Sequence, residues 1–168
     1  MTYTRSLEIE QITQGFRRFP SGVAAVCGMV GGIPTGMVVS SFTAVSTAPP
    51  LVSICPQNSS STWPVLRTSE RIGINVLAKD QADLCRSLAS RKGDRFAGAE
   101  WEATEGGAII LKGSAAHFRC VLREEYPAGD HSVAILEVEA LTLTDSAPLV
   151  YLDFGYPQLS SDRSPVCP

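Results

Sequence analysis

The amino-acid sequence predicts a mostly β protein, a small antiparallel β-barrel with peripheral α-helices. The first observation is the order of the expected elements, because strands follow one another directly and do not alternate strictly with helices. The second is a β-rich run at 23–30 that returns, through a turn of glycine and proline, to another run at 37–41. The third is a pair of long β-rich runs at 115–125 and 132–144. Together they favour a small barrel over a doubly wound parallel sheet.

Three peripheral helices are expected, at residues 7–19, 59–67 and 80–90. The first has apolar residues at helical spacing and is stopped by Pro20, which cannot continue a helix. The second begins in a serine-rich segment that offers several N-caps. Asp80 is expected to cap the third helix.

The remaining strands are short and are expected at residues 51–55, 71–77 and 149–151. Several glycines favour loops through 91–113. Proline, serine and aspartate dominate the end of the chain. We therefore expect one barrel domain over residues 1–152 and a loose C-terminal tail over residues 153–168.

Bulk composition indicates an ordinary globular protein, with no reason to expect binding to nucleic acid or membranes. The chain has 168 residues, of which 44% are hydrophobic and 18% are charged, and its formal net charge is −3. No basic run interleaves with aromatic residues, and no apolar stretch has the length of a membrane span or the pattern of a signal peptide. Five cysteines without Cys-x-x-Cys spacing indicate reduced thiols in the cytoplasm, and two histidines give no support to a histidine-rich metal site.

Two apolar runs end in hydroxyl-rich segments, which are the strongest signal of a binding site. The first segment spans 40–43, and the second spans 59–62 at the start of an expected helix. Hydroxyls, backbone N–H groups and a helix N-terminus are the donors that a phosphate monoester requires. Phe42 and Trp63 stand beside these segments, where their rings could lie against a flat ligand. The pattern favours a pocket for a phosphorylated aromatic cofactor, with turn and cap chemistry as the alternative.

Other polar residues admit two interpretations each. His131 opens an apolar strand, so its ring could reach a cofactor at a barrel mouth or be held by a neighbouring backbone group. His117 lies in mid-strand and is expected to be structural. Arg91, Lys92 or Arg95 could meet a pyrophosphate or a second phosphate, although solvated loop charges are the commoner case. The sequence contains neither a Gly-x-Ser-x-Gly elbow nor a Gly-x-Gly-x-x-Gly motif, so a hydrolase triad and a Rossmann nucleotide site are not supported.

Four segments carry a recognisable pattern when they are taken in order. They are Phe16-Arg-Arg-Phe-Pro-Ser-Gly-Val, Thr35-Gly-Met-Val-Val-Ser-Ser-Phe-Thr-Ala-Val-Ser, Pro49-Pro-Leu-Val-Ser-Ile-Cys and Gly129-Asp-His-Ser-Val. Their order and spacing resemble the short-chain flavin reductases, which are the reductase components of two-component flavin-dependent monooxygenases. The resemblance runs from residue 8 to residue 151 and implies the FMN-binding split-barrel fold.

The resemblance implies an NAD(P)H:flavin oxidoreductase. Such a protein would be a homodimer that uses NADH or NADPH to reduce FMN or FAD, then releases the reduced flavin to a separate monooxygenase. His131 matches the family's histidine that faces flavin and nicotinamide, and is the expected catalytic residue. The expected cofactor-binding residues match family positions around the flavin ring and its phosphate: Met37, Val38, Ser40, Ser41, Phe42, Cys55, Ser59, Ser61, Thr62, Arg95 and Phe96.

Two departures from the family pattern keep alternatives open. Val38 stands where the family often has threonine, and the segment 152–156 lacks the positive charge that helps receive the nicotinamide cofactor in relatives. One alternative is a split-barrel flavoprotein that retains FMN and acts on a small metabolite. The other is a non-catalytic flavin-binding module. The residues do not choose between FMN and FAD, or between NADH and NADPH.

Overall fold

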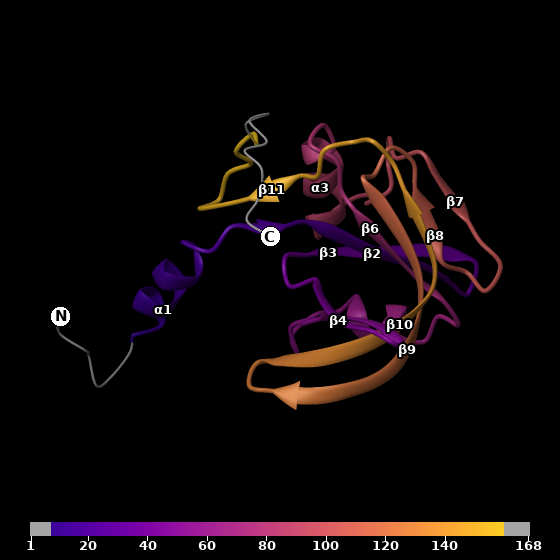
Figure 1. Cartoon of the computed structure of the whole chain (residues 1–168), viewed down its shortest axis with the longest axis horizontal. Helices are drawn as coiled ribbons and strands as arrows, with labels where there is room; N and C mark the ends of the chain where they lie inside the picture. The colour runs from indigo at the N-terminus through magenta and orange to yellow at the C-terminus, as the bar shows by residue number, and fades with distance from the viewer. Residues whose placement is uncertain (1–7, 160–168) are drawn as a thin grey trace.

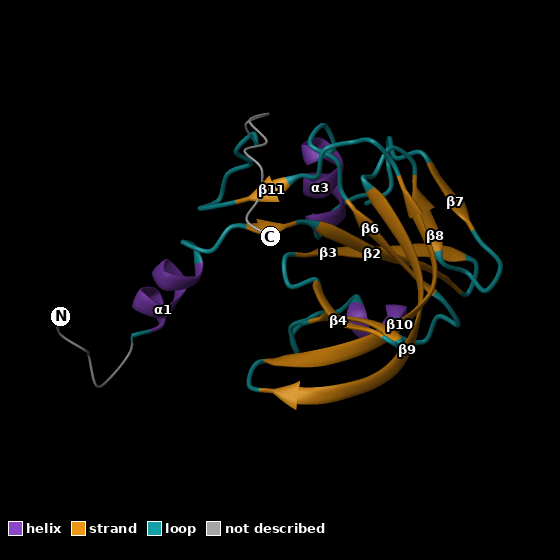
Figure 2. Cartoon of the chain, in the orientation of Figure 1, coloured by secondary structure: helices purple, strands orange, loops and turns teal. Residues whose placement is uncertain are grey.

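An antiparallel sheet of seven strands forms the body of the molecule in the computed structural model, which describes residues 8–159. Neighbouring strands pair antiparallel in the order β3-β2-β6-β9-β10-β5-β4. The bounds of these strands are β2 Ala24–Val30, β3 Ile33–Val39, β4 Thr43–Thr47, β5 Pro50–Ile54, β6 Ile72–Val76, β9 Ala116–Ala128 and β10 His131–Leu143. The sheet curls around its inner face (Figure 1), and strands dominate the molecule (Figure 2), which confirms the predicted mostly β barrel.

The barrel is open along one line, because its two edge strands do not pair with each other. β3 and β4 stand at opposite ends of the strand order, yet only residues 40–42 separate them in the chain. The chain therefore passes from one edge of the sheet to the other without a ladder of hydrogen bonds. We call this line the seam; the first hydroxyl-rich segment lies on it.

Two hydrophobic cores arise from the alternation of side chains along the central strands. On β2, Ala24 and Val26 belong to the core inside the barrel, whereas Ala25 and Cys27 belong to a second core on the outer face. The second core lies between the sheet and two covering elements, α3 (Ala82–Ala89) and β8 (Ile109–Leu111). Because both faces are covered, β2 is apolar along most of its length and shows no hydrophobic–polar alternation.

Gly73 allows β8 to cross close over β6. A Cβ atom placed on Gly73 would lie 2.0 Å from the backbone oxygen of Ile109. No side chain fits at that distance, so only glycine permits the contact. The crossing brings the β7–β8 ribbon onto the sheet and closes the second core.

All three predicted helices are present, but each is shorter than expected. α1 spans Ile9–Phe16 instead of residues 7–19, and α2 spans only Trp63–Leu66. α1 extends away from the barrel (Figure 1), and none of its residues is buried. The guanidinium of Arg17 lies 3.9 Å from the centre of the Phe154 ring, so the end of α1 is tied to the chain that follows the last strand.

Four strands, β1 (Ser21–Gly22), β4, β7 (Trp101–Ala103) and β8, escaped prediction, because each is short, carries little local pattern and forms through its pairing with another strand. The region 91–113, expected to be loops, contains β7 paired with β8. β4 was read only as part of a hydroxyl-rich segment, and β1 pairs with β11 (Val150–Tyr151). The long hairpin is confirmed, although its strands continue further toward the turn than expected and turn at Gly129-Asp130.

The tail is described as far as residue 159. The Tyr156 hydroxyl lies 3.2 Å from the buried Cys85 Sγ, so this part of the expected loose tail contacts α3. Burial and the contact with Cys85 raise the pKa of Tyr156 to about 12. Residues 160–168, including Cys167, lie outside the described residues. Between residues 8 and 159, no helix has the length and apolar character needed to cross a membrane.

Candidate functional site

A pocket of about 690 Å³ opens at the seam of the barrel. β3 contacts both α2 and α3, so the end of β3 forms the floor between two walls. One wall is the chain from the end of β5 to α2, and the other is the end of α3 with the loop that follows. The lining residues come from these elements and the first residue of β10: Met37, Val38, Val39, Ser40, Ser41, Cys55, Pro56, Gln57, Ser59, Ser60, Ser61, Thr62, Leu88, Ala89, Arg91, Arg95 and His131.

A hydrogen bond from Cys55 to Ser41 holds the seam together. The backbone N–H of Cys55 donates to the Ser41 hydroxyl oxygen at 2.8 Å. This bond joins the crossing between β3 and β4 to the end of β5. The two hydroxyl-rich segments therefore line one pocket, as the sequence predicted.

The turn of the long hairpin is clamped to the segment that follows β5, and this brings His131 to the pocket. The Ser132 N–H donates to the Pro56 oxygen at 3.0 Å, and the Asn58 N–H donates to the Asp130 oxygen at 2.9 Å. The His131 Nδ1 lies 2.8 Å from the Asp130 carboxylate, and this hydrogen bond lowers the pKa of Asp130. The imidazole thus has a carboxylate partner on one nitrogen.

In the serine-rich segment 59–62, Ser60 has a structural role, whereas Ser59 and Ser61 have N–H groups that a ligand could accept from. The Ser60 hydroxyl accepts from the N–H groups of Thr62 and Trp63, at 3.3 and 3.1 Å, and so caps the start of α2. Within residues 8–159 the N–H groups of Ser59 and Ser61 have no hydrogen-bond acceptor. The sequence predicted that the N-terminus of this helix would help bind a phosphate. Because α2 has only four residues, that role falls to the hydroxyls and backbone N–H groups of the segment before it.

Arg95 reaches across the floor of the pocket. Its Nη1 donates to the Gly36 oxygen at 2.9 Å and to the Thr62 hydroxyl at 2.7 Å. These bonds orient a partly buried guanidinium beside the serine-rich segment. A hydroxyl that accepts from arginine keeps its own proton for donation to an anion.

The pocket gathers ten of the twelve residues predicted for the site. His131 lines it together with Met37, Val38, Ser40, Ser41, Cys55, Ser59, Ser61, Thr62 and Arg95. Phe42 does not line it and packs against Phe118, with ring centroids 5.3 Å apart. Phe96 is also outside, because its ring is buried against Gly36 and Trp101.

Trp63, expected to lie against a flat ligand, is buried away from the pocket. Its Nε1–H donates to Glu125 at 3.0 Å. Burial alone would raise the pKa of Glu125, but hydrogen bonds from Trp63 and Ser132 and the nearby Arg67 outweigh it and lower that pKa. None of the three aromatic rings that the sequence placed beside a ligand therefore lines this pocket.

The charge of the pocket differs from that of the whole chain. The net charge of the protein is −3, yet the lining contains two arginines, a histidine and no carboxylate. The pocket is therefore suited to an anionic ligand. Sequence reasoning did not select Gln57, Leu88 and Ala89, and it left the role of Arg91 open; no local pattern marks these residues.

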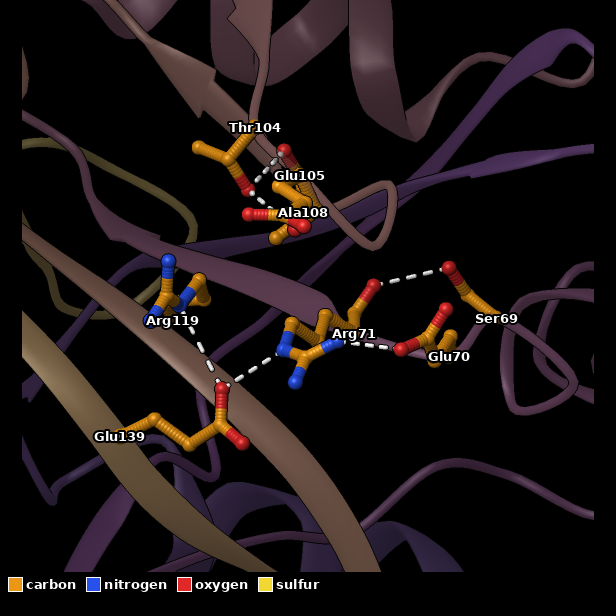
Figure 3. Close-up of polar contacts among 8 residues, drawn as sticks. All are labelled: Ser69, Glu70, Arg71, Thr104, Glu105, Ala108, Arg119 and Glu139. Atoms are coloured by element: carbon orange, nitrogen blue, oxygen red, sulfur yellow. Dashed lines mark hydrogen bonds and ion pairs between the residues drawn. The ribbon is translucent and has the colours of Figure 1, made fainter.

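Two polar clusters elsewhere are structural. In Figure 3, Glu139 of β10 lies between Arg71 and Arg119, at 2.7 and 3.4 Å, and so joins the residue before β6 to β9 and β10. His117 Nδ1–H donates to Asn75 Oδ1 at 3.0 Å; the same oxygen accepts from the Leu111 N–H, so His117 must be the donor. Burial lowers the pKa of His117. Its predicted structural role is confirmed.

Comparison with known proteins identifies the family. A family model described as "Flavin reductase like domain" matches residues 16–160. The chain belongs to this family. Actinorhodin polyketide dimerase of Streptomyces coelicolor is 37% identical, over 90% of this chain and 86% of that protein. The flavin-dependent monooxygenase reductase subunit HsaB of Rhodococcus jostii is 35% identical, over 90% of this chain and 78% of its own length.

A solved structure of a similar protein shares the fold of this chain. The solved Streptomyces globisporus NADH:FAD oxidoreductase SgcE6, in complex with NAD and FAD fragments, resembles this chain with a TM-score of 0.85. The two are 29% identical, and the match covers 92% of this chain and 94% of that one. The predicted split-barrel fold is thereby confirmed for this member of the family.

Proposed function

We propose that this chain is an NAD(P)H:flavin oxidoreductase that reduces FMN or FAD and supplies the reduced flavin to a separate monooxygenase. The observation that carries the proposal is the convergence of ten predicted site residues on one pocket at the seam. Family membership supports the same activity, as do a relative named a monooxygenase reductase subunit and a similar structure named an NADH:FAD oxidoreductase.

The pocket fits a flavin phosphate in size and in chemistry. Its volume of about 690 Å³ falls within the range of roughly 300–1,000 Å³ that small-molecule sites occupy. Ser61 offers hydroxyl and N–H donors, Ser59 offers its N–H, and the Ser59 hydroxyl is held only by a long bond of 3.5 Å to Gln57. Thr62 offers its hydroxyl proton, and Arg95 supplies a positive charge. These groups would hold the ribityl phosphate, because donors and a guanidinium satisfy its oxygens.

With the phosphate at the serine-rich segment, the flavin ring system would occupy the rest of the pocket, which is lined by the seam and His131. Met37 and Val38 offer apolar contact, and the crossing at Ser40-Ser41 offers polar groups at the ring edge. When bound, the flavin supplies the electron sink for a hydride from NADH or NADPH. His131, oriented by Asp130, would hold the carboxamide of the nicotinamide or balance a proton.

The decisive test is anaerobic mixing of the purified protein with FMN or FAD and with NADH or NADPH. Bleaching of flavin absorbance, faster than without protein, is the expected result. A protein that purifies yellow and keeps its flavin through turnover would favour the prosthetic alternative. Binding of flavin without any acceleration of its reduction would leave only the flavin-binding module.

We further propose that the chain acts as a cytoplasmic homodimer. α1 carries exposed Ile9 and Phe16, and the edge strand β4 carries exposed Val45, so apolar side chains remain for a second copy to cover. The four cysteines among residues 8–159 are free thiols, which fits a reducing compartment. Sedimentation equilibrium tests the dimer, since a mass of one chain at micromolar concentration would contradict it.

A further inference from the structure

Arg91 is set apart from the other arginines of its region. Between residues 60 and 130, every other arginine has a hydrogen-bond or ion-pair partner in the described structure. These are Arg67 with Glu125, Arg71 with Glu70 and Glu139, Arg86 with Asp83, Arg95 with Thr62, Arg119 with Glu139, and Arg123 with Glu137. Within residues 8–159 the guanidinium of Arg91 has no such partner, and it lines the pocket.

The backbone around Arg91 is held in place although its side chain is exposed. The Lys92 N–H donates to the Ser90 hydroxyl at 3.1 Å, and the Ser90 hydroxyl donates to the Lys92 oxygen at 2.9 Å. These two bonds bracket Arg91 at the end of α3. Lys92, the next residue, does not line the pocket. The local turn therefore gives the two neighbouring cations different surroundings.

The donors that we assigned to the flavin phosphate, those of the serine-rich segment and Arg95, are enough to bind one phosphate group. Arg95 is committed to Gly36 and Thr62, so its charge stays at the floor beside the serine-rich segment. Arg91 belongs to the wall formed by Leu88 and Ala89, and the other wall carries the serines. A ligand that filled the pocket with a single phosphate at the serines would leave the Arg91 charge without a counterion.

We propose that Arg91 binds a second phosphate group, the pyrophosphate of a dinucleotide, in this pocket. The inference rests on the proposed function, because it assumes a flavin phosphate at the serine-rich segment. A planar guanidinium with free N–H groups matches phosphate oxygens in pairs, and the lining contains no carboxylate to compete for its charge. FAD and NAD(P)H both contain a pyrophosphate, so either could supply it, and FMN contains none.

The test uses the full-length protein and three forms of it: wild type, Arg91→Gln, and Lys92→Gln as the matched control. Dissociation constants for FMN and FAD are measured by fluorescence titration, and KM for NADH and NADPH is measured with FMN as the flavin. If FAD supplies the pyrophosphate, R91Q raises the ratio of the FAD to the FMN dissociation constant about tenfold. If NAD(P)H supplies it, R91Q raises KM for the nucleotide about tenfold with FMN as the flavin. K92Q should shift neither ratio.

Two results would overturn the inference. R91Q could weaken FMN and FAD equally without raising KM for the nucleotide, which would place Arg91 on the shared phosphate. Alternatively, R91Q could match K92Q in every measurement, which would make Arg91 a solvated surface charge. A wild-type protein that binds neither flavin would instead overturn the proposed function, so the two failures are distinguishable.

Discussion

Arg95 and Thr62 meet across the floor of the seam pocket, where Nη1 of the arginine donates to the threonine hydroxyl at 2.7 Å. The two residues come from different walls, since Thr62 precedes α2 and Arg95 follows α3. The bond joins the two walls, and both residues line the same pocket.

Replacing Thr62 with valine should weaken flavin binding. The change removes a hydroxyl that we propose donates to the phosphate, and it leaves Arg95 without one of its two acceptors. A hydrogen bond to a charged group contributes about 1.5–3 kcal/mol, so the FMN dissociation constant should rise roughly tenfold or more. Fluorescence titration measures the change. Thr62→Ser keeps the hydroxyl and should stay close to wild type; equal binding by both variants would contradict the prediction.

Replacing Asp130 with asparagine should slow turnover more than it weakens flavin binding. The carboxylate of Asp130 holds His131 Nδ1 at 2.8 Å, and an amide holds it less strongly and in either orientation. We expect kcat to fall about threefold to tenfold, with the FMN dissociation constant unchanged. Glu124→Gln, in the same hairpin, is the control for a lost charge. Equal kcat values in D130N and wild type would show that Asp130 does not position His131.

Gly73→Ala should strongly destabilise the fold. The added Cβ would lie 2.0 Å from the Ile109 oxygen, and that atom belongs to backbone that cannot rotate away. The expected loss in the free energy of unfolding is about 3 kcal/mol, at the upper end for an overpacked site. Gly22→Ala is a matched control in a strand, because its Cβ would meet no atom within 4 Å. Urea denaturation compares the two, and similar midpoints would contradict the crossing of β8 over β6.

His117 should make stability fall as the pH falls below about 6.5, the ordinary value for histidine. Burial lowers its pKa in the folded protein, although Glu102 opposes this shift. Between the lowered pKa and 6.5 the unfolded chain binds more protons than the folded one, so acid favours unfolding in that window. Urea denaturation at pH 7.5 and pH 5.5 measures the slope. His117→Gln can still donate to Asn75, but it does not titrate, and a slope as steep as that of wild type would contradict the prediction.

Local chemistry allowed much of the fold to be predicted. The turn at Gly31-Gly32 and the long hairpin follow from the residues that form them, because hydrogen bonding and backbone restriction act within a few positions. The hydroxyl-rich segments were also recognisable, since their donors lie next to each other in the chain. Ten site residues could accordingly be named from the sequence and its family resemblance, and they meet in one pocket.

Only the tertiary structure decided which of these side chains face the pocket. Trp63 is turned away by Glu125, which lies more than sixty residues further along, and Phe96 is drawn under β3 because Gly36 leaves room for its ring. β4 shows no hydrophobic alternation and exists through its pairing with β5. Arg91 enters the pocket wall because α3 packs against β3. The sequence by itself determined the local elements and the kind of chemistry available, whereas long-range packing determined which groups could act together.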